Sequence, residues 1–204
     1  MDVALQVLTG FGLSVSAGLN AYIPLLALGI AGRFLPGFAL PTGWDWLAND
    51  WVMIIIAVLL ALEIVADKVP IVDSINDVVQ TVVRPAAGGI AFGSGSASTT
   101  TIVQDPAAFF ASNAWVPVAI GAAVALGIHL LKASVRPILN GITAGIAAPV
   151  VSIAEDVGAV LMTVAAILIP VLVVLGLGAL VWAFIAIRRR ARRRAVAKAA
   201  AAGT

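Results

Sequence analysis

The sequence of 204 residues contains no cysteine and a single histidine, His129. The absence of cysteine excludes disulfides, thiolate nucleophiles and thiolate metal sites, and a single histidine excludes a zinc site built from several imidazoles. Charged residues are also scarce, at 11% of the chain against about 25% in an ordinary soluble domain. Hydrophobic residues make up 62%, so there is too little charge to cover a water-soluble surface. The composition therefore predicts an integral membrane protein without a metal ion or other cofactor.

Basic residues are concentrated near the C-terminus. Seven of the twelve lie within residues 188–198, and six of these are arginines within residues 188–194. The other five stand against all ten acidic residues, so the apolar body is mildly acidic. A basic run can bind nucleic acid, but this one directly follows an apolar stretch. We therefore interpret residues 188–204 as a cytoplasmic tail that contacts anionic lipids rather than nucleic acid, and residues 1–187 as the transmembrane domain.

The hydropathy pattern predicts an all-α fold, a polytopic transmembrane helix bundle. The apolar stretches lie at residues 3–32, 51–66, 70–93, 114–131, 138–154 and 157–187. The first is expected to be one crossing that is kinked or unwound around Asn20, and Pro170 is expected to kink the last. Residues 70–93 and 138–154 are polar or broken, and each is either a buried crossing or a re-entrant pair of half-helices. The chain then has about six membrane segments, or four crossings if both of these stretches re-enter.

The distribution of Lys and Arg predicts the orientation in a bacterial cytoplasmic membrane. With six segments, three cations fall on the same side as the tail: Lys68, Lys132 and Arg136. The connections at 34–50 and 94–113 contain no Lys or Arg and fall on the other side. The positive-inside rule therefore places both termini in the cytoplasm, with Arg33 as the exception.

Two stretches of the sequence match at an offset of 64 residues, ALEIVADK at 61–68 and ALGIHLLK at 125–132. The same offset also pairs Asn76 with Asn140 and Pro85 with Pro149. Apolar helices resemble one another by chance, but Lys, Asn and Pro are uncommon in such segments. The pattern indicates an internal repeat with units at about 51–92 and 114–156, a plan in which transporters place their site between the units.

Nine polar residues within or beside the apolar stretches are candidates for a transport site, because a charge in the membrane costs about 2.5–3.5 kcal/mol. They are Asn20, Glu63, Asp67, Asp73, Asp77, Arg84, His129, Lys132 and Arg136. The acidic residues are spaced by four and the last three by three and four, so each set shares one helix face. We expect at least one carboxylate–cation contact between residues 63–84 and residues 129–136. The alternative is that these side chains extend to the lipid headgroups and form no site.

The candidates differ in the chemistry that they suggest. Glu63 resembles a proton-coupling carboxylate. His129 is suited to relay protons near neutral pH, although a lone helical histidine is more often a packing residue. Arg84 precedes a proline and a glycine-rich stretch, where it is suited either to bind a phosphate or carboxylate group or to pair with Asp73 or Asp77 for structure. There is no Ser–His–Asp arrangement or metal motif, so no residue is predicted to be catalytic.

Many of these residues fall in motifs typical of one family. The motifs are SAGLNAYIPLLALG at 16–29, EIVADKVP at 63–70, DSIND at 73–77, RPAAGG at 84–89, HLLKASVR at 129–136 and ED at 155–156. In these motifs the sequence resembles the domain-of-unknown-function 4126 family of uncharacterised bacterial integral membrane proteins. The resemblance covers most of the chain apart from the loops and the basic tail. It implies a polytopic membrane protein and brings no established activity.

Three functional hypotheses remain. The leading one is a small transporter-like or channel-like protein, homo-oligomeric, that moves a small ion, a polar solute or an anionic lipid headgroup through a polar site between the two repeats. In this hypothesis Asn20 contributes amide and backbone groups. The second is a non-catalytic structural or assembly protein of the membrane. The third is a membrane lipid-phosphate enzyme, which is less favoured because the Ser-Arg phosphate motif expected with the pair Glu63 and Asp67 is missing. The sequence thus predicts a protein that is not an enzyme.

Overall fold

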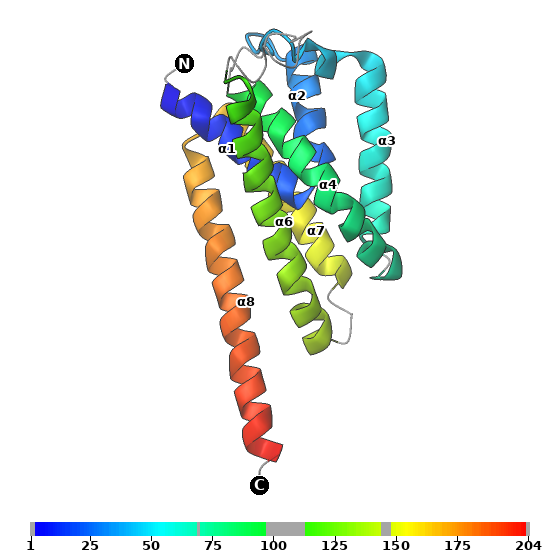
Figure 1. The fold of residues 1–204 in the computed structure, drawn as a ribbon, viewed down its shortest axis with the longest axis vertical. Helices are drawn as coiled ribbons and strands as arrows, with labels where there is room; N and C mark the ends of the chain where they lie inside the picture. The colour runs from blue at the N-terminus through cyan, green and yellow to red at the C-terminus, as the bar shows by residue number, and fades with distance from the viewer. Residues whose placement is uncertain (1–2, 69, 97–112, 144–147, 203–204) are drawn as a thin grey trace.

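The computed structural model describes residues 3–68, 70–96, 113–143 and 148–202. Within these ranges the chain forms seven α-helices and one short 3₁₀ helix, with no strand, which confirms the all-α prediction (Figure 1). In chain order the elements are α1 (Val3–Leu19), α2 (Tyr22–Phe34), η1 (Asp45–Ala48), α3 (Asp50–Ala66), α4 (Pro70–Gly95), α6 (Trp115–Thr143), α7 (Ala148–Leu168) and α8 (Leu172–Ala202).

The first two helices form a hairpin that turns back inside the bundle. In Figure 1, α1 begins at the same end of the bundle as the connection between α2 and α3, and α2 returns to that end. At ~1.5 Å per residue, the 17 residues of α1 extend about 25 Å and the 13 residues of α2 about 20 Å. Between them lies Asn20, which is fully buried. The hairpin therefore ends in the interior of the protein.

This hairpin replaces the single kinked crossing predicted for residues 3–32. The reason lies in Asn20, whose side-chain oxygen accepts hydrogen bonds from the backbone N–H groups of Tyr22 (3.1 Å) and Ile23 (3.2 Å). An asparagine in this position caps the start of a new helix. Pro24 then falls in the first turn of α2, where the N–H that it lacks would have no helical partner. Asn20 and Pro24 together favour a new helix over a bent continuation of α1.

The other helices run back and forth along the long axis of the bundle. In Figure 1 the start of α1 and the end of α8 lie at opposite ends. The sequence had predicted that both termini share one side of the membrane. Among the described helices, the α1–α2 hairpin does not cross the bundle and α3, α4, α6, α7 and α8 run along it, so the two ends of the described chain lie at opposite ends of the bundle.

Two polar or broken stretches also differ from the expectation. Residues 70–93 belong to the continuous helix α4, with Pro85 inside it, and do not form re-entrant half-helices. Residues 138–154 are not a separate segment, because α6 continues to Thr143 and α7 begins at Ala148. Around Pro170 the chain does not kink within one helix. It makes a turn in which Leu172 N–H donates to the Ile169 carbonyl oxygen (2.9 Å), and α8 starts there.

Close helix packing at glycines sets the centre of the bundle. A Cβ atom at Gly88 of α4 would lie 2.7 Å from the carbonyl oxygen of Gly121 in α6. A Cβ atom at Gly18 of α1 would lie 2.7 Å from the carbonyl oxygen of Ala125, one turn further along α6. Small residues allow helix backbones to approach this closely in membrane proteins. As a result α1 packs closely against α6 at Gly18, and α4 packs closely against α6 at Gly88.

Within the described part of the chain, three helical stretches are long and apolar enough to cross a membrane: Trp115–Arg136, Pro149–Leu168 and Leu172–Arg194. Their mean hydropathy is 1.8–1.9. On α3, the outward side chains Ile54, Ile55, Val58 and Leu62 are exposed, as in a helix that faces lipid. These features support a membrane protein, as the composition predicted.

The internal repeat receives no support from the helix boundaries. Pro85 lies inside α4, whereas Pro149 is the second residue of α7. The stretch at 61–68 ends a helix, whereas the matching stretch at 125–132 lies in the middle of α6. The two prolines therefore do not mark equivalent breaks, and the internal repeat stays a prediction from the sequence.

Candidate functional site

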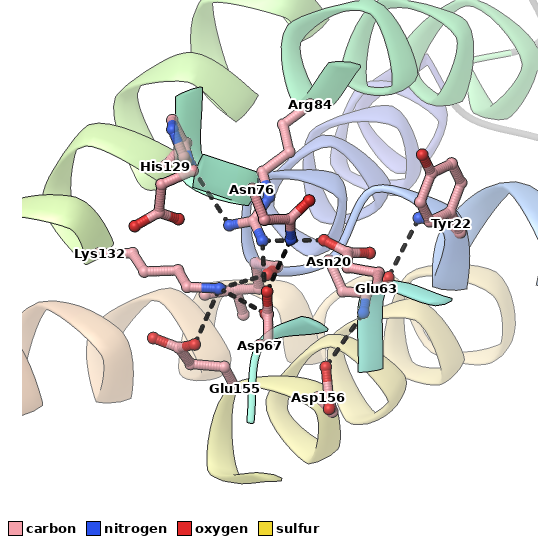
Figure 2. Close-up of polar contacts among 12 residues, drawn as sticks. Asn20, Tyr22, Glu63, Asp67, Asn76, Arg84, His129, Lys132, Glu155 and Asp156 are labelled. Atoms are coloured by element: carbon pink, nitrogen blue, oxygen red, sulfur yellow. Dashed lines mark hydrogen bonds and ion pairs between the residues drawn. The ribbon is translucent and has the colours of Figure 1, made fainter. Parts of the chain in front are cut away.

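Charged side chains from four helices meet inside the bundle, next to the α1–α2 break (Figure 2). We call them the charge cluster, and its members are Glu63 and Asp67 at the end of α3, Asp77 and Arg84 of α4, Lys132 and Arg136 of α6, and Glu155 of α7. Most of these side chains are removed from solvent: the exposed side-chain fraction is 0% for Arg84, 1% for Glu63 and 3% for Asp67. Buried charges at these positions require partners, and the cluster supplies them.

Arg84 occupies the centre of this arrangement. One of its terminal nitrogens, Nη2, donates to Glu63 Oε1 at 2.9 Å and lies 3.9 Å from Asp67 Oδ2. The other, Nη1, donates to the Gly18 carbonyl oxygen at 3.1 Å and faces His129 Nδ1 at 3.3 Å. The guanidinium of Arg84 therefore connects α4 to α3, to α6 and to the end of α1.

Asp67 is the carboxylate shared among the cations. Its Oδ2 atom lies 3.4 Å from Lys132 Nζ and 3.7 Å from Arg136 Nη2, in addition to Arg84. Its other oxygen accepts a hydrogen bond from Asn76 Nδ2 at 2.8 Å. The contact between Asp67 and Lys132 confirms the predicted carboxylate–cation contact between residues 63–84 and residues 129–136.

A second carboxylate, Glu155, closes the cluster from α7. Its Oε2 atom lies 2.9 Å from Lys132 Nζ and 3.3 Å from Arg136 Nη2. Arg136 also reaches toward Asp77, at 3.9 Å. Lys132 and Arg136 are thus each held between carboxylates of different helices. The alternative that they extend to the headgroups does not describe these side chains.

His129 is held in one tautomer by its two neighbours. Arginine has no acceptor, so the 3.3 Å contact with Arg84 requires Nδ1 to carry the lone pair. At Nε2, the partner is Thr81 Oγ1 at 3.1 Å, and this hydroxyl already donates to the Asp77 carbonyl oxygen at 2.8 Å. The Nε2–H therefore donates to Thr81. Both ring nitrogens are engaged in a neutral imidazole, which favours the packing interpretation of His129 over the proton relay.

The broken end of α1 faces the cations. The Gly18 carbonyl accepts from Arg84 and the Leu19 carbonyl from Lys132 Nζ (3.4 Å), so the unpaired carbonyls of this helix end are stabilised by positive charge. Asn20 Nδ2 donates to Asp156 Oδ1 of α7 at 3.0 Å. In this way the α1–α2 break is joined directly to the charge cluster.

Several buried polar atoms have no hydrogen-bond partner among the described residues. They are Trp44 Nε1, Glu63 Oε2, Asp77 Oδ1, Gln80 Oε1, Arg84 Nε and Ser152 Oγ. Three of these are acceptor oxygens on the α3 and α4 side of the cluster. The cluster also contains four carboxylates and three cations, so the ionised groups carry one excess negative charge. Both features favour a cation or a proton as an additional partner.

The structure places eight of the nine predicted residues together, and the side chain of Asp73 lies outside the described part. The sequence analysis missed five polar residues of the same helices: Asn76, Gln80, Thr81, Glu155 and Asp156. A signal for the first three was present, because residues 76, 77, 80, 81 and 84 share one face of α4. Glu155 and Asp156 carried the signal of two adjacent acids between apolar stretches. Among the described residues no group of three or more His, Cys, Asp and Glu forms a candidate metal site.

These features define a helical membrane protein with a buried charge cluster at a broken helix. The chain matches the family model described as Domain of unknown function (DUF4126) over residues 7–190, and it belongs to this family. The family's function is unknown, so membership does not assign an activity. No curated protein and no solved structure matches the chain.

Proposed function

We propose that this protein transports a small ion, with the charge cluster as its site and a cation or a proton as the preferred cargo. The observation that carries the proposal is the clustering of seven charged groups between helices, five of them buried, with one more carboxylate than cation. Ionisable groups in a membrane interior are costly and commonly mark an ion pathway. In this proposal the protein is not an enzyme.

Glu63 is the residue that we expect to exchange the cargo. Its Oε1 atom is bonded to Arg84, whereas Oε2 is buried without a partner among the described residues. A proton or small cation at Oε2 would weaken the attraction between Glu63 and Arg84. Arg84 would then be drawn toward Asp67, which lies 3.9 Å away.

The α1–α2 break links this exchange to a change of shape. Arg84 and Lys132 hold the carbonyl oxygens of Gly18 and Leu19, so movement of either cation alters the support of the helix end. Broken helices that meet ions near the middle of the membrane are a recurring element of secondary transporters. The hairpin is therefore the part that we expect to move during transport.

Flux through vesicles tests the proposal. We expect purified protein in phosphatidylglycerol vesicles to dissipate an imposed gradient of protons, Na⁺ or K⁺, measured with an internal pH dye and ion electrodes in separate arms. Glu63→Gln should reduce the rate by about tenfold or more, because a barrier increase of only ~1.4 kcal/mol has this effect. Asp50→Asn is the matched control, since Asp50 is exposed and lies at the start of α3, at the opposite end of this helix from Glu63.

Two outcomes would contradict the proposal. One is the absence of flux of all three ions through the wild-type protein. The other is an unchanged flux in Glu63→Gln when this variant retains the wild-type melting temperature.

The second candidate function is a structural or assembly protein of the membrane. It is favoured by the observation that Arg84, Lys132 and Arg136 each contact carboxylates from other helices, as expected of a lock between helices. Loss of stability in Glu63→Ala, without any flux in the wild-type protein, would support this alternative.

We further propose a bacterial cytoplasmic membrane location with the basic end of α8 in the cytoplasm and the start of α1 on the opposite side. The six arginines at 188–194 are hard to translocate. We expect a reporter after α8 to be active only in the cytoplasm and one ahead of α1 only outside it. Reporters that place both ends on the same side would contradict the path of the α1–α2 hairpin.

A further inference from the structure

A groove with a volume of about 390 Å³ opens between α6, α7 and α8, on the side of the bundle away from α3. Among its sixteen described lining residues only Lys132 and Glu155 are charged. Its walls are formed mainly by aliphatic side chains and one aromatic ring, including Val135, Leu139, Val151, Ala154, Leu180 and Phe184. The groove exists because α8 diverges from the other helices (Figure 1).

The dimensions of the groove match one leaflet of a bilayer. On α8 the lining extends from Leu177 to Ile187, which is about 15 Å at ~1.5 Å per residue. The hydrocarbon core of a bilayer is ~30 Å thick, so the groove covers the depth of one leaflet. Only 6% of the α8 membrane window is buried, against 28% in each of the other two windows. The groove thus lies open to the hydrocarbon.

Positive charge stands at one end of the groove. Arg188 directly follows the last lining residue, Ile187, and begins the run of six arginines. Its guanidinium carbon lies 5.1 Å from the centre of the Phe184 ring, which lines the groove, so this cation is held at the groove mouth. Basic residues beside a membrane-spanning helix attract anionic lipid headgroups.

We propose that the groove binds one acyl chain of an anionic phospholipid of the cytoplasmic leaflet, with the headgroup phosphate at Arg188 and Arg189. The bound chain covers the Lys132–Glu155 ion pair, which otherwise faces the hydrocarbon through the groove. The lipid-binding proposal does not depend on the transport proposal, and its test requires no flux measurement.

The test measures lipid binding to the purified full-length protein in detergent. Phosphatidylglycerol and phosphatidylcholine with identical acyl chains are titrated in parallel, and the thermal unfolding midpoint gives the apparent affinity of each. We expect phosphatidylglycerol to bind about thirtyfold more tightly, since two arginines contribute ~1 kcal/mol each near an anionic surface and ~1.4 kcal/mol is a tenfold change in affinity. Equal affinity of the wild-type protein for the two lipids would overturn the proposal.

Two variants separate the headgroup and acyl-chain parts of the site. Arg188→Gln with Arg189→Gln should abolish the preference for phosphatidylglycerol, whereas Arg193→Gln with Arg194→Gln should retain it. Retained preference in the first pair would overturn the headgroup assignment.

Gly158→Leu should fill the groove and weaken the binding of both lipids. A Cβ atom at Gly158 meets only Leu19 Cδ1, at an ordinary 3.6 Å. The matched control is Gly178→Leu on α8, where a Cβ atom meets nothing within 4 Å. Unchanged lipid binding in Gly158→Leu would overturn the site.

A second copy of the chain is the competing occupant of the groove. The protein has no cysteine, so a single cysteine at position 180 reports this directly. We expect Leu180→Cys to remain uncrosslinked between copies under oxidation. Efficient crosslinking between copies would overturn lipid occupancy.

Discussion

Replacing Arg84 with methionine should strongly destabilise the protein, so that only a small fraction of it folds. Arg84 is fully buried and is the hydrogen-bonding partner of Glu63, so its loss leaves a carboxylate with 1% exposure uncompensated. Breaking a buried ion pair in this way costs about 3–5 kcal/mol, a large part of the stability of a domain. The measurement is the melting temperature and the monodisperse fraction in detergent. The matched control, Arg33→Met, removes an exposed ion pair with Asp50 and should change stability by at most about 1 kcal/mol.

The double variant Arg84→Met with Glu63→Leu tests whether the loss of stability comes from the broken ion pair between these two residues. It removes both charges, so we expect it to be more stable than Arg84→Met alone. A double-mutant cycle gives the coupling energy between the two residues. Additive effects of the two substitutions would show that Arg84 acts mainly through Gly18, His129 and Asp67.

Replacing Gly88 with leucine should separate α4 from α6 and prevent correct packing. At this position a Cβ atom would lie 2.7 Å from the Gly121 carbonyl oxygen and would also collide with the Ala125 Cβ atom. Overpacking of a side chain costs about 1–3 kcal/mol, and here the opposing atoms include backbone that cannot change rotamer. We expect a loss of more than about 3 kcal/mol, measured as the free energy of unfolding in detergent, or loss of expression.

The control for Gly88 lies on α6. A Cβ atom at Gly127 meets nothing within 4 Å, so Gly127→Ala should leave stability unchanged or raise it by up to about 1 kcal/mol through helix propensity. If Gly88→Ala proves as stable as the wild-type protein, the close approach of α4 and α6 is contradicted.

The existence of the most apolar helices could be predicted from the sequence. The uncharged stretch before Arg188 and the apolar run of α6 are recognisable because composition alone determines transfer into lipid. The spacing of Glu63 and Asp67, and of Lys132 and Arg136, also predicted shared faces correctly. These are local properties of a helix, and they require no knowledge of its neighbours.

The sequence could not predict where a helix ends inside the bundle. An apolar stretch has the same hydropathy whether it crosses or turns back, so residues 3–32 resembled one crossing. The turn at Asn20 depends on Asp156, Arg84 and Lys132, which are distant in sequence. In the same way, the polar helix α4 is stable because its polar face meets partners on other helices.

The sequence predicted that acidic and basic helix faces lie opposite each other, but it did not predict that Arg84 lies at the centre of the charge cluster. Glu63 was expected near one of four basic residues, Arg84 among them, but the sequence did not indicate which one, and for Arg84 itself it named only Asp73 and Asp77 as structural partners. Glu63 and Arg84 are 21 positions apart on different helices, so only the crossing of α3 and α4 brings them together. The unpartnered Glu63 oxygen is likewise a property of the packed state.

The long-range bonds of α1 determine the order in which the protein matures during synthesis. Ser16 donates to the Ala159 carbonyl oxygen at 2.8 Å, a partner 143 residues later, and Asn20 bonds to Asp156, 136 residues later. Contacts of such separation form slowly because a long chain must close first. Although α1 is synthesised long before α7, it thus acquires these neighbours only after α7 has been made. Until then the Ser16 hydroxyl and the Asn20 amide lack these partners, and they depend on water or on the insertion machinery for hydrogen bonds.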